Sequence, residues 1–269
     1  MLIFGITLLS PCFLMETVSF FAALQPVFSR NFSILASEAL TRIPGISTIH
    51  FFTHLEHHDD PLYLYDTQIA IIHLVSQYTS LSSHPIWVNL SLRSLLCMKY
   101  LRQLVGLLED ASLTHKIGIE ITETFFCDDL DSIQIGLTFL YEACQKMAIP
   151  IILDDFGDGY SSLLLLNIIP FEYVKLSRSL IYTSQRNQRG QVLLDHLIQI
   201  IRHMNGKVVA EGIETYETYR FLYDLGCDAF QGNWLAKPAT MPLAKAPHSV
   251  VSLSSDILNN LRMMSWPQI

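Results

Sequence analysis

Short apolar segments recur along the chain, and their spacing constrains the fold more than any other feature. Several are apolar on both faces, and stretches with helical periodicity separate most of them. Strands that are apolar on both faces are typical of a parallel sheet covered by helices. We therefore expect strands at residues 19–28, 34–42, 85–91, 116–122, 150–156, 173–177, 207–213 and 229–235.

This alternation predicts an α/β protein with a TIM-type (β/α)8 barrel. A chain of 269 residues, half of them apolar, is large enough to form such a barrel as one unit. Only a short loop separates the first two strand segments, so we expect them to pair as a hairpin. The first strand would then be the one antiparallel strand of the barrel.

Apolar stripes indicate the helices between the strands. Periodic apolar residues occur over residues 69–75 and 137–147, and a final helix is expected from Ser252 to Met263. A further stripe is expected to face the core, and it consists of Leu193, Leu197, Ile200 and Ile201.

Residues 1–18 form an apolar segment ahead of the barrel, which we assign to residues 19–269. The segment lacks the basic start and the small-residue cleavage site of a signal peptide. Pro11 and Glu16 interrupt the run of roughly 20 apolar residues that a membrane-spanning helix needs. We expect a helix packed against the barrel or against a partner protein, and attachment to a membrane surface stays open.

Charge and cysteine content narrow the class of protein. The net charge of −8 offers no basic surface for a DNA or RNA polymer. An acidic protein that handles a phosphorylated ligand needs cations near the phosphates, which points to metal ions. The 5 cysteines show no CxxC spacing, so we expect reduced thiols in a cytoplasmic protein.

Polar side chains fall where the predicted strands end. The active site of a TIM barrel lies at the C-terminal ends of its strands, so these side chains should meet on one rim. In chain order they are Glu38, Asn89, Glu120, Asp154 with Asp155, Lys175, Glu211 and Gln231. Carboxylates gathered so closely repel one another unless cations neutralise them.

The donor types select the kind of cation. All the candidate ligands are oxygens, which favour Mg²⁺ or Mn²⁺ over zinc. The adjacent acids Asp154 and Asp155 suit a site for two ions, which clamp an in-line phosphoryl displacement. Lys175 is either an ion-pair partner of the acids or the group that orients or deprotonates the attacking water.

Ordered motifs give this pattern a specific counterpart. They are SEALTRI (37–43), VNLS (88–91), IEITET (119–124), DDFGDGYSSL (154–163), VKLSRSL (174–180), VAEGIET (209–215) and QGNWLAKP (231–238). Together they resemble the successive signatures of the EAL-domain cyclic di-GMP phosphodiesterases, over nearly the whole chain. The resemblance implies a bacterial, metal-dependent hydrolase that converts cyclic di-GMP to linear pGpG by a two-metal in-line mechanism.

The resemblance also implies roles for individual residues. One ion would be held by Glu38, Asn89, Glu120 and Asp154, and the other by Asp154, Asp155 and Glu211. The expected catalytic residues are Lys175, which would activate the water, Glu38 and Glu211. The expected substrate contacts are Gln25, Leu40, Arg42 and Gln231. The residues expected to support the metal site and the loop after the fifth strand are Glu123, Asp158 and Glu214.

The chain departs from the family pattern at three positions. Asp158 stands where the family usually has threonine, on a loop that in the family couples dimerisation to metal binding. Ser177 replaces an aspartate after the sixth strand, and Asn233 replaces an aromatic residue. None of these changes removes an expected metal ligand or the lysine, so activity is expected.

Two other functions fit parts of the pattern. A non-catalytic cyclic di-GMP receptor or protein-interaction module could use the same fold, and a hydrolase of another phosphoester could use the same acids. Arg42 and Gln25 match nucleotide-contact positions, which favours cyclic di-GMP. The resemblance also implies a homodimer formed through the loop at Asp158 and the helix near Ser179.

Overall fold

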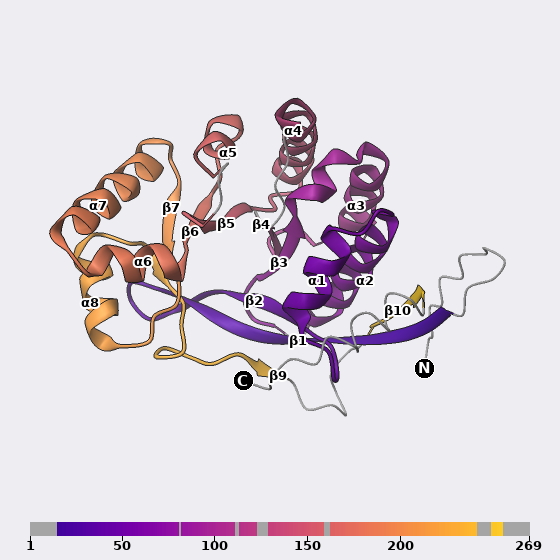
Figure 1. Ribbon diagram of the computed structural model, residues 1–269, viewed down its shortest axis with the longest axis horizontal. Helices are drawn as coiled ribbons and strands as arrows, with labels where there is room; N and C mark the ends of the chain where they lie inside the picture. The colour runs from indigo at the N-terminus through magenta and orange to yellow at the C-terminus, as the bar shows by residue number, and fades with distance from the viewer. Residues whose placement is uncertain are drawn as a thin grey trace.

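The computed structural model describes residues 15–80, 82–110, 113–122, 129–158, 162–240 and 249–254. Its centre is a closed sheet in which neighbouring strands follow the chain order from β1 to β8, and β8 pairs back to β1. Figure 1 shows helices standing around the outside of this sheet. The strands are β1 (Met15–Ser29), β2 (Ile34–Arg42), β3 (Ile86–Ser91), β4 (Ile117–Thr122), β5 (Ile151–Phe156), β6 (Tyr173–Leu176), β7 (Lys207–Ala210) and β8 (Ala229–Phe230).

One strand runs against the others. β1 is antiparallel to β2 and to β8, whereas each pair from β2 to β8 is parallel. The turn between Ser29 and Ile34 is too short for the crossover that a parallel connection requires, so a hairpin forms. The predicted TIM-type barrel with an antiparallel first strand is confirmed.

β1 is longer than its part in the barrel. Its first residues, Met15–Phe20, pair with β10 (Ser249–Ser254), and Ala23 and Leu24 pair with β9 (Ala239–Thr240). The helix expected from Ser252 to Met263 is therefore wrong over Ser252–Ser254, which are strand residues. The rest of that segment lies outside the described residues.

The predicted first segment, residues 1–18, lies only partly within the described part of the chain. Met15–Val18 are strand residues of β1, so a helix over residues 1–18 does not reach them. Residues 1–14 lie outside the described part of the chain, and their predicted helix stays a prediction. Within the residues that the structure describes, no helix has the length and apolar character needed to cross a membrane.

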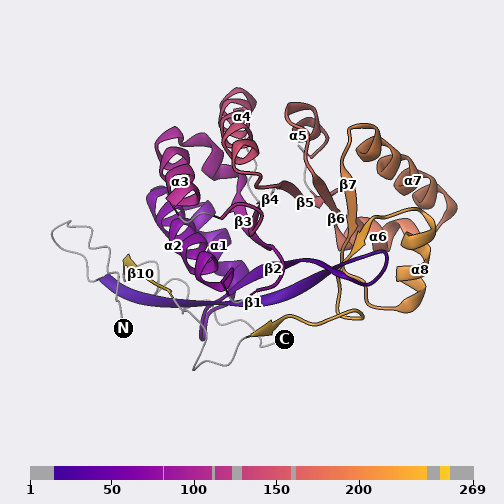
Figure 2. The same cartoon turned by 180° about the vertical axis from the view of Figure 1, so that it is seen from behind.

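The helices cover the outer face of the sheet, as the view from behind also shows (Figure 2). They are α1 (Thr48–Glu56), α2 (Leu62–Tyr78), α3 (Met98–Asp110), α4 (Leu130–Lys146), α5 (Ser162–Ile168), α6 (Arg178–Gln185), α7 (Gln188–His203) and α8 (Tyr216–Asp224), with a 3-10 turn at η1 (Leu92–Leu96).

The predicted core-facing stripe of α7 is wrong at Leu193 and Ile200 but is confirmed at Ile201, and Leu197 is partly buried against the core. Leu193 and Ile200 are 54% and 42% exposed, whereas Leu194, Ile198 and Ile201 are buried against the sheet. The apolar residues of α7 occupy more of its circumference than one face, so the pattern fits two neighbouring stripes. Packing against β7 selects the stripe that begins one residue later.

Candidate metal and catalytic site

The polar rim arises from the two-residue repeat of the strands. A compact apolar cluster fills the interior of the barrel, and it consists of Val27, Ala36, Trp87, Ile152, Tyr173, Val209 and Ala229. Two residues further along β2, β3, β5 and β6, and just after β7 and β8, come Glu38, Asn89, Asp154, Lys175, Glu211 and Gln231. Alternate side chains of a strand share a face, so these polar groups point inward above the cluster. β1 runs the other way, and its Gln25 precedes Val27 by the same interval.

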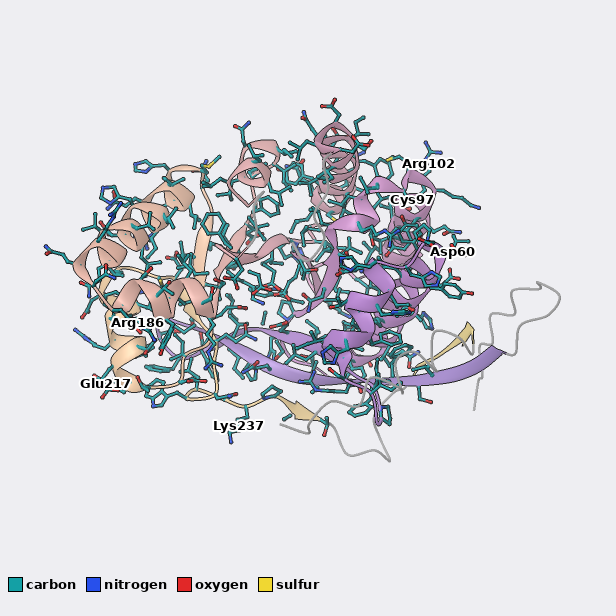
Figure 3. The ribbon with its side chains drawn as sticks, in the orientation of Figure 1. Asp60, Cys97, Arg102, Arg186, Glu217 and Lys237 are labelled. Carbon is teal, nitrogen blue, oxygen red and sulfur yellow. The ribbon has the colours of Figure 1, made fainter. Side chains whose placement is uncertain are left out.

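Lys175 lies at the centre of this rim. Its side chain is 1% exposed, and Nζ lies 2.5 Å from Glu211 Oε1 and 2.9 Å from Asp154 Oδ1. The same Nζ lies 3.1 Å from Glu120 Oε1 and 3.2 Å from Glu38 Oε2. Figure 3 shows oxygen-tipped side chains gathered inside the barrel, whereas the labelled Arg186, Glu217 and Lys237 lie toward its periphery.

Glu38 is the best-anchored carboxylate of the rim. Asn89 Nδ2 donates to its Oε1 at 3.2 Å, and Gln231 Nε2 donates to its Oε2 at 2.7 Å. Burial raises the pKa of Glu38, but the charge of Lys175 and these hydrogen bonds lower it more, so the net pKa lies below its ordinary value. Glu38 is therefore ionised at neutral pH.

The other acids are held less favourably. Burial, and then repulsion by neighbouring carboxylates, raises the pKa of Glu120 and Glu211 well above the ordinary value, although Lys175 opposes the rise. Burial and the charge of Asp154 raise the pKa of Asp155 to about 6. Burial lowers the pKa of Lys175, but the surrounding carboxylates outweigh it and raise the pKa well above the usual value. One ammonium group thus balances only part of the negative charge.

The oxygens of the rim fit hard divalent cations. One carboxylate oxygen from each of Glu38, Glu120 and Asp154 lies within 4.8 Å of the others, and Asp154, Asp155 and Glu211 form a second such group. Among the described residues, three buried oxygens of the rim have no donor or cation within reach: Asn89 Oδ1, Glu120 Oε2 and Gln231 Oε1. Buried acceptors of this kind need a donor or a cation, and Asp154 is shared by both groups.

An irregularity in β5 brings both aspartates into the site. Neighbouring residues of a regular strand point to opposite faces, yet Asp154 and Asp155 line the same cavities. The register between β5 and β6 shifts between Leu153 and Phe156, and Asp155 has φ of +49°. This bulge turns the second carboxylate toward the first, at the cost of a left-handed backbone.

Two cavities meet at the acids. Glu38, Asp154 and Asp155 line both of them. One, of about 270 Å³, is otherwise mostly polar and includes Gln25, Arg178, Glu214 and Asn233. The other, of about 390 Å³, has a largely apolar wall that includes Leu40, Arg42, Ile49 and Phe52. A ligand with an apolar ring and a phosphate could therefore place the ring against the apolar wall. Its phosphate would then lie where the two cavities meet, next to cations bound by the acids.

Glu214 and Arg42 line these cavities, and Asp158 lies on the turn that follows Asp155. Glu214 forms an exposed ion pair with Arg178 at 2.8 Å. Arg42 Nη1 donates to the carbonyl oxygen of Thr41 at 2.9 Å. Asp158 accepts from Ser177 Oγ at 2.9 Å. Glu123 lies outside the described residues, so its role stays a prediction.

Sequence reasoning missed several residues that line the cavities, among them Arg178 and Phe52. Arg178 is the second residue after β6, and its place in the VKLSRSL motif was a usable signal. Phe52 belongs to α1, and its ring packs edge-on against Phe51, which is fully buried. Adjacent phenylalanines on a helix do not reveal which of them faces a cavity.

Comparison with known proteins agrees with this geometry. Cyclic di-GMP phosphodiesterases of Pseudomonas aeruginosa are among the similar sequences: the bifunctional MucR is 34% identical over 140 residues, 50% of this chain and 20% of that protein. NbdA is 30% identical over 149 residues, 55% of this chain and 18% of that protein. The chain thus spans about a fifth of the length of these curated relatives.

Solved structures give the same result for the fold. The PaMucR phosphodiesterase in complex with c-di-GMP is 27% identical, with a TM-score of 0.70, over 82% of this chain and 92% of that one. The calcium and cyclic di-GMP complex of Klebsiella pneumoniae BlrP1 is 26% identical, with a TM-score of 0.69, over 87% and 59%. The family model of the EAL domain matches residues 14–238. This chain belongs to the EAL domain family.

Proposed function

We propose that this chain hydrolyses cyclic di-GMP to linear pGpG. The observation that carries the proposal is the rim itself: carboxylates from separate strands surround one buried lysine, in a chain of the EAL domain family. Relatives named as cyclic di-GMP phosphodiesterases, and a related structure in complex with c-di-GMP, support the choice of substrate.

Two divalent cations, Mg²⁺ or Mn²⁺, complete the proposed site. Glu38, Asn89, Glu120 and Asp154 would hold one ion, and Asp154, Asp155 and Glu211 the other. When bound, the ions would balance the carboxylates, polarise the phosphodiester and lower the pKa of a water molecule. The all-oxygen donor set supports this choice of ions, as do calcium and manganese complexes of a related Klebsiella protein.

In the proposed reaction Lys175 orients the attacking water. Its Nζ lies within 3.2 Å of carboxylates from both metal groups, so a water held between them is within its reach. In the proposed reaction the water oxygen bonds to phosphorus, and the bond from phosphorus to the 3′ oxygen breaks. The water proton leaves to a base, and the 3′ oxygen gains a proton to become a hydroxyl group.

The two cavities account for the proposed substrate contacts. Gln231 Nε2 lies 3.4 Å from Gln25 Oε1, and Gln25 Nε2 donates to the carbonyl oxygen of Ala236 at 3.1 Å. These contacts hold both amides at the polar cavity. Leu40 and Arg42 line the apolar one, where the leucine offers a surface for a base and the guanidinium a charge for a phosphate.

We also retain the proposal that the chain forms a homodimer, and that residues 1–18 contact a protein partner. Leu163 and Leu164 on α5 are 56% and 52% exposed, which supports an apolar contact between copies near the β5 loop. The molar mass in solution, measured by light scattering after gel filtration, distinguishes a dimer from a monomer.

The direct test of function is hydrolysis by the purified chain. We expect pGpG as the product with Mg²⁺ or Mn²⁺, identified by chromatography and mass. Tight binding of cyclic di-GMP without product would support a receptor instead. Faster turnover of other cyclic dinucleotides or of simple phosphodiesters would contradict the proposed substrate.

A further inference from the structure

The turn after β5 determines where Asp155 lies. The backbone N–H of Asp158 donates to the carbonyl oxygen of Asp155 at 3.1 Å, and Gly157 within this turn has φ of +105°. A Cβ atom on Gly157 would come 2.7 Å from Leu180 Cδ2, so the turn packs directly against α6. The place of Asp155 therefore depends on how this turn is attached to α6.

Asp158 and Ser177 form that attachment. Ser177 precedes α6, and its backbone N–H donates to the carbonyl oxygen of Phe156 at 3.1 Å. Its Oγ donates to Asp158 Oδ1 at 2.9 Å and accepts from the N–H of Leu180 at 3.2 Å. Ser179 Oγ donates to the same carboxylate oxygen. One fully buried serine thus caps α6 and fastens the turn to it.

These two residues are also two of the positions at which the chain departs from the pattern it resembles. Threonine is usual at position 158 and aspartate at position 177, so the carboxylate and the hydroxyl have changed places. The structure shows that the two positions are in direct contact. The contact joins an acid and a hydroxyl group, the two kinds of group that the usual aspartate and threonine would bring to these positions the other way round.

We propose that Asp158 and Ser177 are a compensating pair that positions Asp155 for metal binding. This inference rests on the proposed metal-dependent function, and Asp158 acts through Asp155. The group of Asp154, Asp155 and Glu211 depends on the turn, because Asp155 lies at its start. The group of Glu38, Glu120 and Asp154 is held by Lys175. None of these three acids belongs to the turn, so the group does not depend on it.

The test is Mn²⁺ binding to the purified chain, followed by electron paramagnetic resonance without substrate. Here the second ion is the one held by Asp154, Asp155 and Glu211, and the first is the other. Asp158→Thr should weaken the affinity for the second ion about tenfold, as loss of a group that supports a metal ligand does, and leave the affinity for the first ion unchanged. Ser177→Asp should weaken it too, because two carboxylates then face each other. The double exchange Asp158→Thr with Ser177→Asp should restore affinity to within about threefold of the wild type.

Some results would overturn the inference. One is an Mn²⁺ affinity of Asp158→Thr equal to that of the wild type. Another is a double variant whose affinity is weakened as much as the two single effects combined. Asp195→Thr on α7 is the matched control, because it removes one partly exposed carboxylate, which accepts a hydrogen bond from Gln199, from an outer helix and should not change binding. A wild-type chain that binds no Mn²⁺ would refute the proposed function itself. Two bound ions without rescue would refute only the pair.

A second comparison applies if Ser177→Asp does not fold. Asp158→Asn keeps a carbonyl oxygen as acceptor for both hydroxyl groups, whereas Asp158→Ala removes it. We expect the asparagine variant to bind the second ion within about threefold of the wild type, and the alanine variant about tenfold more weakly. Equal binding by the two variants would contradict a positioning role.

Discussion

Replacing Lys175 with methionine removes the cation around which the rim carboxylates are arranged. The side chain is 1% exposed, and Nζ lies within 3.2 Å of four carboxylates. Methionine keeps an apolar stem of similar length and supplies no charge. Removing one partner of a buried ion pair costs about 3–5 kcal/mol, so the free energy of unfolding should fall by about that amount at neutral pH with a chelator present.

The loss should depend on pH with a definite sign. The pKa values of Glu120, Asp154 and Glu211 are raised in the folded chain, first by burial and then by neighbouring carboxylates. An acid with a raised pKa destabilises the fold most above that pKa, and protonation relieves the penalty as the pH falls. The pKa of Lys175 is also raised, so its stabilising charge is fully present throughout the neutral and acid range. The difference between the variant and the wild type should therefore shrink toward about pH 5.

Urea denaturation with a chelator, at both pH values, measures these differences. Lys207→Met is the matched control: Lys207 pairs with Glu172 at 3.4 Å while about half exposed, so its loss should cost less than about 1 kcal/mol. Mn²⁺ at a hundredfold excess over its dissociation constant should return about 2.7 kcal/mol to the Lys175→Met variant for each ion that binds. The reasoning is refuted if Lys175→Met and Lys207→Met are equally stable at neutral pH.

The other predictions concern the metal ligands and the backbone near them. Glu38→Gln should lower turnover about a hundredfold or more while the circular dichroism spectrum stays unchanged, and substantial residual turnover would exclude Glu38 as a ligand. Mn²⁺ binding, measured by calorimetry, should weaken as the pH falls below 6, because Asp155, with a pKa raised to about 6 by burial and by Asp154, then takes up a proton. Binding independent of pH in that range would contradict this. Gly232→Ala should destabilise the chain by about 1–3 kcal/mol in thermal unfolding, since a Cβ would lie 2.2 Å from backbone atoms of Ile213. An unchanged melting temperature would show that the backbone here shifts to accommodate the added Cβ without loss of stability.

The strands and their polar ends could be predicted from the sequence because one repeat governs both. The parallel strands are short and largely apolar, and a polar residue follows an inward-facing one at an interval of two. Ala36 with Glu38, and Tyr173 with Lys175, show the pattern. The barrel then brings these ends together whatever the intervening helices contain.

Other features depend on tertiary contacts that no local pattern carries. The bulge that turns Asp155 inward requires a positive φ, and aspartate adopts that backbone only when its surroundings hold it. The predicted stripe of α7 was wrong at Leu193 because Leu193 and Leu194 are equally apolar, and only packing against the sheet distinguishes them. Strand β10 forms because the long β1 offers it an edge, which Ser249–Ser254 cannot indicate on their own.

The central claim is that the acids surrounding Lys175 hold two cations and that these are needed to hydrolyse cyclic di-GMP. The measurement that tests it most directly is the rate of pGpG formation as a function of Mn²⁺ bound per chain. We predict two bound ions, with turnover that rises as the second site fills. Full turnover in the presence of excess chelator, or none with both sites filled, would contradict the account.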